Sequence, residues 1–386
     1  MKKTLLIAAA VSGTFAMTAA HAQSSVTLYG TLDAGLVFAN NEGGHQNWQQ
    51  SSGALTDSVF GLRGNEDLGG GLHAVFRLES AINVNNGATF YNNSLFGRQA
   101  YVGLSSDQYG TITLGRQFDS MVDYLSPLAM TGVDGLDGGN NLAAHPFDND
   151  NLGSTFSINN AVKYTSLDYN GLQFGGLYGF SNQAGGFGNN RAYSLGASYK
   201  NGPLNFAAGY MELNNAPGGN TTGAVAQGTT NSAITASTHR EFGAGLNYAF
   251  GPATVGFVWT HTQLEDISNV TLDGESQAVA GGTNLRLDNF ELNGRYALTP
   301  ALSLNGAYTF TDGHETGTAN SSSPKWQQGT LEADYSLSKR TDVYVEGVYQ
   351  HVNGGSGAFA NAAINTLTPS STDTQVAATV GLRTRF

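Results

Sequence analysis

The chain ends on QVAATVGLRTRF (residues 375–386), in which apolar and other side chains alternate as far as the last residue. Leu382 and Phe386 share one parity, whereas Arg383 and Arg385 share the other. Chain ends are usually polar and frayed, but a period of two is that of a β-strand with two different faces. The stretch therefore predicts an ordered terminal strand with one apolar and one hydrated face.

The same alternation recurs in VTLYGTLDAGLVFAN (26–40) and LHAVFRLESAIN (72–83). Between such stretches, short connections with tight-turn residues such as Asn-Gly and Gly-Pro alternate with longer polar ones. The seven short connections are 67–71, 106–109, 170–171, 201–203, 251–252, 299–300 and 338–340. The eight long ones are 41–57, 85–94, 119–157, 183–191, 215–239, 265–287, 312–326 and 353–373. Fifteen connections join sixteen strands.

Transmembrane barrels have an even number of antiparallel strands, with short periplasmic turns and long outer loops. A soluble β-sandwich would also alternate, but it shows no strict rule of short and long connections. The chain has no cysteine, so disulfides do not hold the fold together. We predict an all-β fold, a sixteen-stranded antiparallel transmembrane β-barrel in which the last strand pairs with the first, because lipid cannot satisfy an open sheet edge.

Residues 1–22 have the pattern of a secretory signal peptide. A positive MKK start precedes an apolar stretch, and Ala20-His21-Ala22 forms a small-residue cleavage site. A retained membrane anchor is the alternative, but the length and the cleavage site favour removal. We therefore predict export, with residues 23–386 forming the barrel.

Five stretches together resemble the general porins of Gram-negative outer membranes, of the Neisseria, Bordetella and Burkholderia type. They are SSVTLYGTLDAGL (24–36), FGLRGNEDLGGGLHAVFRLES (60–80), FGRQAYVGL (96–104), YGTITLGRQFD (109–119) and GLRTRF (381–386). The resemblance implies a homotrimeric channel whose third loop folds into the lumen. It also implies that Phe386 belongs to the signal read by the barrel-assembly machinery.

The longest connection, 119–157, stands where this family places its constriction loop, and it contains six aspartates but no lysine or arginine. We expect four of the aspartates to contribute to the pore: Asp119, Asp123, Asp134 and Asp137. The other two, Asp148 and Asp150, are expected to be solvated loop residues.

Five basic residues within the early strands are expected to form the opposite wall of the pore: Arg63, Arg77, Arg98, Arg116 and Lys163. A charge on the lipid face would cost about 2–4 kcal/mol near the midplane. Arg98 and Arg116 fall on the apolar parity, but each follows a glycine, and we predict that a bulge turns both inward. The resemblance matches Arg63, Arg98 and Arg116 most directly to the family's pore arginines, and Lys163 to another basic position.

The predicted function is passive diffusion of small hydrophilic solutes and ions through a channel surrounded by outer-membrane lipid, with a weak preference for cations. A substrate-selective channel and a surface adhesin or receptor, acting through loops 215–239 and 265–287, are the alternatives. No H-E-x-x-H, G-x-S-x-G or P-loop motif occurs, and the histidines are dispersed. We predict no enzyme activity, cofactor, metal or nucleic-acid partner.

Overall fold

The computed structural model describes residues 25–91, 94–132, 139–214, 222–225, 234–272, 275–317 and 321–386. The signal-peptide prediction for residues 1–22 lies outside the described residues. Among the described residues, no helix is long and apolar enough to cross a membrane.

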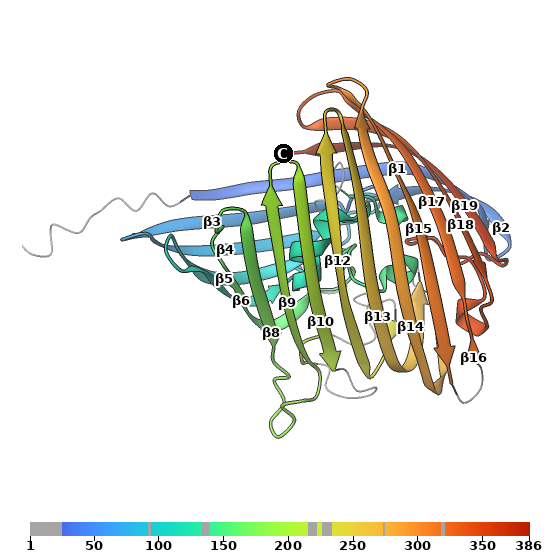
Figure 1. Cartoon of the computed structure of the whole chain (residues 1–386), viewed down its shortest axis with the longest axis horizontal. Helices are drawn as coiled ribbons and strands as arrows, with labels where there is room; N and C mark the ends of the chain where they lie inside the picture. The colour runs from blue at the N-terminus through green and yellow to red at the C-terminus, as the bar shows by residue number, and fades with distance from the viewer. Residues whose placement is uncertain are drawn as a thin grey trace, which may run out of the picture.

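Sixteen antiparallel strands in the described part of the chain form the wall of a closed barrel, as predicted (Figure 1). They are β1 (Ser25–Glu42), β3 (Val59–Gly69), β4 (Leu72–Ala81), β5 (Gln99–Ser106), β6 (Gly110–Gln117), β7 (Ile158–Thr165), β8 (Leu172–Gly179), β9 (Arg191–Asn201), β10 (Leu204–Asn214), β12 (Thr238–Phe250), β13 (Ala253–Leu272), β14 (Glu275–Ala297), β15 (Leu302–Thr316), β17 (Lys325–Ser336), β18 (Thr341–Asn353) and β19 (Thr374–Arg385). Three further strands, β2 (His45–Ser52), β11 (Ile234–Thr235) and β16 (Ser321–Ser322), pair at the ends from which the long connections leave.

Strand β19 closes the sheet on β1, with Arg385 opposite Thr31 and Ala377 opposite Ala39. The last residue takes part in this pairing, because the backbone N–H of Phe386 donates to Gly30 O over 3.0 Å and Gly30 N–H donates back over 3.1 Å. The prediction that the terminal segment seals the barrel is confirmed.

The two faces of the wall follow the alternation in the sequence. Leu28 and Leu36 on β1 are each 58% exposed on the outer face, whereas Asp33 between them is buried inside. On β19, Val380 and Leu382 are exposed, whereas Arg383 is 1% exposed. An apolar outer face and a polar interior are what a barrel in lipid requires.

Several predicted long loops are partly or wholly strand. The segment 265–287 is the clearest error, because β13 and β14 stay paired as far as Leu272 opposite Glu275, with register shifts near Ile267. Strand β15 likewise continues into 312–326 as far as Thr316, and β16 and the start of β17 lie in the same segment, while β2 lies within 41–57. Beyond the lipid boundary a strand needs no apolar face, so polar residues can continue the backbone ladder without the alternation that identifies a membrane strand.

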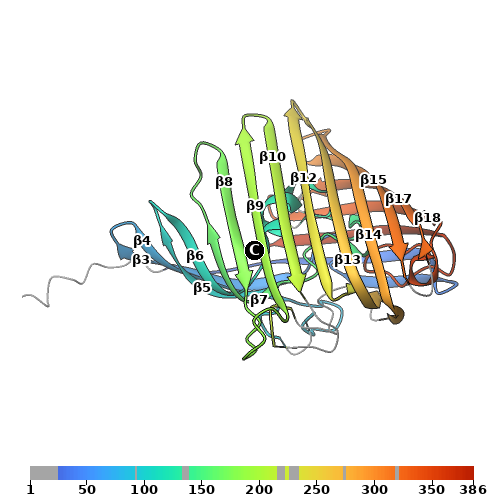
Figure 2. The same ribbon diagram turned by 60° about the horizontal axis from the view of Figure 1, so that its bottom comes forward.

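The segment between β6 and β7 contacts the inner face of the barrel through its helical turns, which lie between strands β8–β13 and the blue strands in Figure 2. These turns are η1 (Met121–Leu125), η2 (Ser126–Leu128), η4 (Asn141–Ala143) and η5 (Pro146–Asp148); a further turn, η6 (Gly357–Phe359), precedes β19.

A row of glycines makes room for η1 on the wall. Gly196, Gly209 and Gly243 are direct cross-strand partners on β9, β10 and β12. A Cβ atom on Gly196 would lie 2.5 Å from Tyr124, and one on Gly209 would lie 2.8 Å from the sulfur of Met121. The absence of side chains along this row therefore lets the helical turn lie against the backbone of the wall.

Candidate pore constriction

Within the part of the chain that the structure describes, two interior cavities share four lining residues. A cavity of about 660 Å³ lies between the segment 118–157, which we call the inner segment, and the wall formed by β1 and β3–β8. It reaches Arg385 near the short turns. A second cavity, of about 370 Å³, lies toward the long connections. Both are lined by the same four residues, which we call the junction ring: Asp57, Asn141, Gly153 and Ser154.

Hydrogen bonds and an ion pair fix the junction ring. The side-chain amide of Asn141 donates to Asp57 Oδ1 over 3.1 Å and to Gly53 O over 2.8 Å. The guanidinium of Arg98 pairs with the other oxygen of Asp57, and its Nε donates to Glu79 Oε1 over 2.9 Å. Asp57 thus joins the connection before β3 both to the inner segment and to the basic wall.

The charged side chains of the wall along the larger cavity are paired with opposite charges. Arg77 Nε donates to the hydroxyl of Tyr29 over 2.7 Å, and this hydroxyl donates to Glu79 Oε2 over 2.7 Å. Lys163 Nζ lies 2.7 Å from Asp123 Oδ2. The predicted basic residues Arg77, Arg98 and Lys163 therefore line the cavity, and each has a carboxylate beside it.

Two predicted wall residues lie apart from both cavities. Arg63 is exposed, with its guanidinium 5.3 Å from the ring centroid of Tyr29. Arg116 donates to Asn159 Oδ1 over 2.6 Å and to Ser157 O over 3.1 Å, so it ties the start of β7 to the end of β6. Neither residue lines either cavity.

The prediction of bulges after glycines is confirmed at one position and wrong at the other. The β6–β7 register shifts between Gly115 and Gln117, and Gly115 has a φ of +136°, so Arg116 occupies a bulge. Arg98 instead precedes β5, which begins at Gln99 and pairs with β4 without a register shift. Its inward direction comes from the preceding turn and not from a bulge.

The acidic residues of the inner segment are not all in the same environment. Asp123 lines the larger cavity. Asp119 is buried and lies elsewhere, because its carboxylate accepts hydrogen bonds from Met121 N–H over 2.7 Å and from Asn151 Nδ2 over 2.7 Å at the start of η1. Burial raises the pKa of Asp119 to about 6.

Asp134 and Asp137 lie outside the described residues. The described residues on either side of them, Gly132 and Gly139, both line the larger cavity.

The expectation that Asp148 and Asp150 are solvated is wrong, because both are buried. Asp148 accepts hydrogen bonds from Gly153 N–H over 2.8 Å and from the Thr155 hydroxyl over 2.6 Å. It therefore folds the end of the segment back on itself and supports Gly153 in the junction ring.

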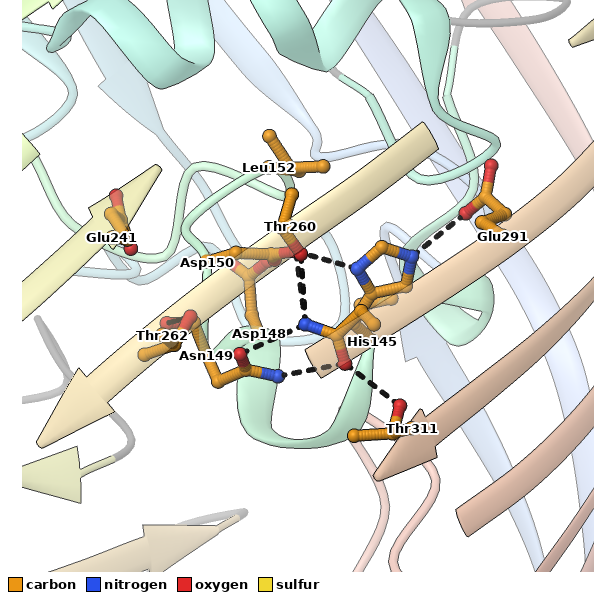
Figure 3. A network of polar contacts seen from close by, with 12 residues as sticks. His145, Asp148, Asn149, Asp150, Leu152, Glu241, Thr260, Thr262, Glu291 and Thr311 are labelled. Atoms are coloured by element: carbon orange, nitrogen blue, oxygen red, sulfur yellow. Dashed lines mark hydrogen bonds and ion pairs between the residues drawn. The ribbon is translucent and has the colours of Figure 1, made fainter. Parts of the chain in front are cut away.

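Asp150 belongs to a buried network, shown in Figure 3, that fastens the inner segment to the barrel wall. His145 lies between two carboxylates: its Nδ1 is 2.6 Å from Asp150 Oδ2 and its Nε2 is 3.1 Å from Glu291 Oε2 on β14. The hydroxyl of Thr260 on β13 donates to Asp150 Oδ2 as well. All four residues are fully buried.

The two carboxylates determine the charge of His145. Burial alone would favour the neutral ring, but attraction to Asp150 and hydrogen bonds to Asp150 and Glu291 raise the pKa of His145 to about 10. Burial works against the charged form of Asp150 too, yet His145 lowers its pKa. A protonated imidazole thus links the inner segment to the wall at neutral pH.

Asn289, between Thr260 and Thr311, extends this network. Its amide donates to Thr260 Oγ1 over 2.9 Å and to Asn149 Oδ1 over 3.0 Å, and it accepts from Thr311 over 2.7 Å. Sequence reasoning missed these wall residues, because they lie more than 100 residues from the segment that they hold. The only available signal was that Thr260, Asn289 and Glu291 fall on the inward parity of their strands.

Comparison with known proteins identifies the family. Residues 7–355 match the family model of Gram-negative porins. The chain belongs to this family. It is 32% identical to an outer membrane porin protein of Bordetella pertussis over 392 aligned positions, which cover 90% of this chain and 94% of the relative.

Solved structures share the fold of this porin. One is the anion-selective porin from Comamonas acidovorans, with a TM-score of 0.68 and 22% identity over 94% of this chain and 100% of the other. Another is OmpT, an outer membrane protein of Vibrio cholerae, in a trimer form, with a TM-score of 0.61 and 17% identity over 94% of this chain and 99% of the other. The protein is therefore a porin of the Gram-negative outer membrane, a water-filled β-barrel channel for passive diffusion of small hydrophilic solutes and ions.

Proposed function

We propose that the junction ring is the narrowest part of the passage and sets the selectivity of this porin. The observation that carries the proposal is that the two cavities share Asp57, Asn141, Gly153 and Ser154. A polar solute can exchange water for such fixed polar groups as it passes, whereas an apolar solute gains nothing from them. Passage needs neither a conformational cycle nor an energy source.

The charge selectivity is weak, because the charges along the larger cavity nearly balance. The described cationic side chains that line it are Arg77, Arg98, Lys163 and Arg385, and the carboxylates are Asp57, Glu79 and Asp123. Asp134 and Asp137 fall between the lining residues Gly132 and Gly139. We propose that these two aspartates turn the balance toward cations.

The functional porin is a homotrimer embedded in outer-membrane lipid, and it transports solutes without catalysis. The trimer form of OmpT and the family membership support this proposal. Residues 1–22 direct export and are removed, residues 23–386 form the barrel, and Phe386 is read by the barrel-assembly machinery. A native gel band at three protomer masses that collapses on boiling tests the trimer.

The decisive experiment on the ring is a planar-bilayer measurement of reversal potential across a salt gradient with Asp57→Asn. Loss of one unit charge about 6 Å from the ion path is worth about 0.7 kcal/mol in water, so the permeability ratio shifts about threefold toward anions. Asp168→Asn is the matched control, because Asp168 lies in the exposed turn between β7 and β8. Equal results for the two variants would refute the ring as the selectivity site.

Liposome swelling with sugars of increasing size separates the alternative functions. A gradual decrease of swelling rate with solute size supports general diffusion, whereas rapid swelling with one sugar alone would indicate a substrate-selective channel. Complete impermeability would leave only a surface adhesin or receptor role.

A further inference from the structure

A polar cavity of about 390 Å³ lies on the outer surface of the barrel, separate from the passage. It spans β13, β14, β15 and β17, which lie side by side in Figure 1. Its ionisable lining residues are His261, Arg286, Asp288, Asp312, His314 and Lys325. They face outward, because the residues next to them in sequence, Thr260, Leu287 and Thr311, are fully buried on the inner side.

The position of this cavity on the barrel corresponds to lipid headgroups. Two residues closer to the short turns on the same outer face, Trp259 precedes His261 on β13 and Phe290 follows Asp288 on β14. Nearer still to the short turns the outer face is apolar, with Phe257 and Leu292 exposed. Aromatic girdles mark the edges of the apolar band of a membrane barrel. The cavity therefore lies just beyond the band, on the side of the long outer connections.

The carboxylates in this cavity are already engaged. Asp288 Oδ1 lies 2.9 Å from His261 Nδ1 and accepts a hydrogen bond from Trp259 Nε1 over 3.3 Å. Asp312 pairs with Lys325. Both acids thus already have polar partners within the outer face.

The cation Arg286 is different. It is exposed, and its side chain has no hydrogen bond or ion pair within the part of the chain that the structure describes. His314 lies directly opposite it on β15, with Nδ1 3.5 Å from the Ser323 hydroxyl. Arg286, His314 and Ser323 therefore place hydrogen-bond donors at one end of the cavity without a carboxylate to occupy the guanidinium.

We propose that Arg286 and His314 bind the phosphate group of an outer-leaflet lipid headgroup. A guanidinium offers two parallel N–H donors that match phosphate oxygens. A basic residue at an anionic membrane surface is attracted to it by about 1 kcal/mol. The lipid is held beside the girdle, so its acyl chains can lie along the apolar outer face below Trp259 and Phe290. The site rests on the membrane position of the barrel and not on the junction ring.

The experiment is native mass spectrometry of the detergent-solubilised porin after incubation with phosphatidic acid or, separately, with diacylglycerol, which has the same acyl chains but no phosphate. The wild type is expected to retain more phosphatidic acid than the lipid without phosphate. Arg286→Gln is expected to reduce the retained phosphatidic acid about fivefold, the equivalent of about 1 kcal/mol. Arg240→Gln is the matched control, because Arg240 also faces outward beyond the aromatic residues but is paired with Glu212 at 2.9 Å, and it is expected to behave as wild type.

Three results would overturn the proposal. Equal retention of the two lipids by the wild type would remove the phosphate preference. An equal loss in the Arg286 and Arg240 variants would show a general effect of surface charge. Displacement of phosphatidic acid by excess inorganic phosphate would assign the site to a free anion and not to a lipid. Unchanged heat-resistant gel mobility of both variants verifies that they are folded.

Discussion

The inner surface of this barrel has two regions that differ in what covers them. The wall formed by β1 and β3–β8 borders the larger cavity, and its ion pairs, such as Lys163 with Asp123, lie beside the passage. The wall formed by β10–β15 lies under the inner segment, where His145, Asp150 and Glu291 are fully buried. Both regions follow the same inward parity and both pair their charges. The placement of the inner segment decides which charges meet solutes and which hold the segment.

The two regions differ in energetic consequence as well. An ion pair in contact with water is screened and contributes little to stability. A buried pair that loses one partner leaves an uncompensated charge, which is strongly destabilising. Substitutions in the wall that the inner segment covers should therefore change the shape of the pore. Substitutions in the wall formed by β1 and β3–β8, which we call the open wall, should change its selectivity.

The largest effect is expected for His145→Ala. Without the imidazolium, Asp150 and Glu291 face each other uncompensated inside the protein, which costs about 3–5 kcal/mol. The inner segment should then leave the wall, so that single-channel conductance changes in size and becomes noisy, and urea unfolding in detergent begins at a lower concentration. His45→Ala is the control, because His45 is exposed on β2. Identical conductance traces for both variants would mean that the buried network does not hold the segment.

Alkaline pH should reproduce part of this effect in the unchanged protein. The pKa of His145 is about 10 in the folded state and 6.5 ordinarily, so the folded state holds the proton more tightly. The stabilisation is complete below about pH 6.5, declines as the pH rises and is lost above about pH 10. Wild type should lose resistance to urea between pH 7 and pH 10 relative to His145→Gln. Parallel pH profiles of the two proteins would contradict the assignment of the proton to His145.

The wall could be predicted from the sequence because lipid imposes a pattern on it. Leu28 and Leu36 must face outward and Asp33 inward, and the tight turns set the strand count. Outside the lipid this constraint ends, which is why the pairing of Leu272 with Glu275 was expected to be a loop.

The candidate site could be predicted only in part. Parity identified Arg77 as an inward residue, and the glycine before Arg116 correctly indicated a bulge. Parity does not show what covers an inward residue. Asp150 and Glu291 are 141 positions apart in the sequence, and they meet on His145 only because the inner segment crosses the lumen. That contact cannot be predicted from the composition or from the periodicity of the sequence.

A smaller effect, confined to selectivity, is expected for Asp134→Asn combined with Asp137→Asn. Removal of two negative charges should shift the permeability ratio toward anions by at least about threefold, the effect of one unit charge about 6 Å away in water. Conductance should stay steady, because the His145 network is intact. Reversal potentials measured across a salt gradient test this. An unchanged or more cation-selective ratio would remove both aspartates from the passage.

The smallest effect is expected for Arg63→Gln. Arg63 lies on the face of β3 that points into the barrel, with its guanidinium over the ring of Tyr29. It is exposed to water and lines neither cavity. Charges in water are screened within about 8 Å at physiological salt, so the permeability ratio should change less than for Asp57→Asn, and the difference should shrink further at high salt. If Arg63→Gln shifts the reversal potential as strongly as Asp57→Asn, selectivity is distributed along the whole open wall. The charges of the open wall would then produce a continuous electrostatic field along the passage, and the junction ring would contribute only one part of that field.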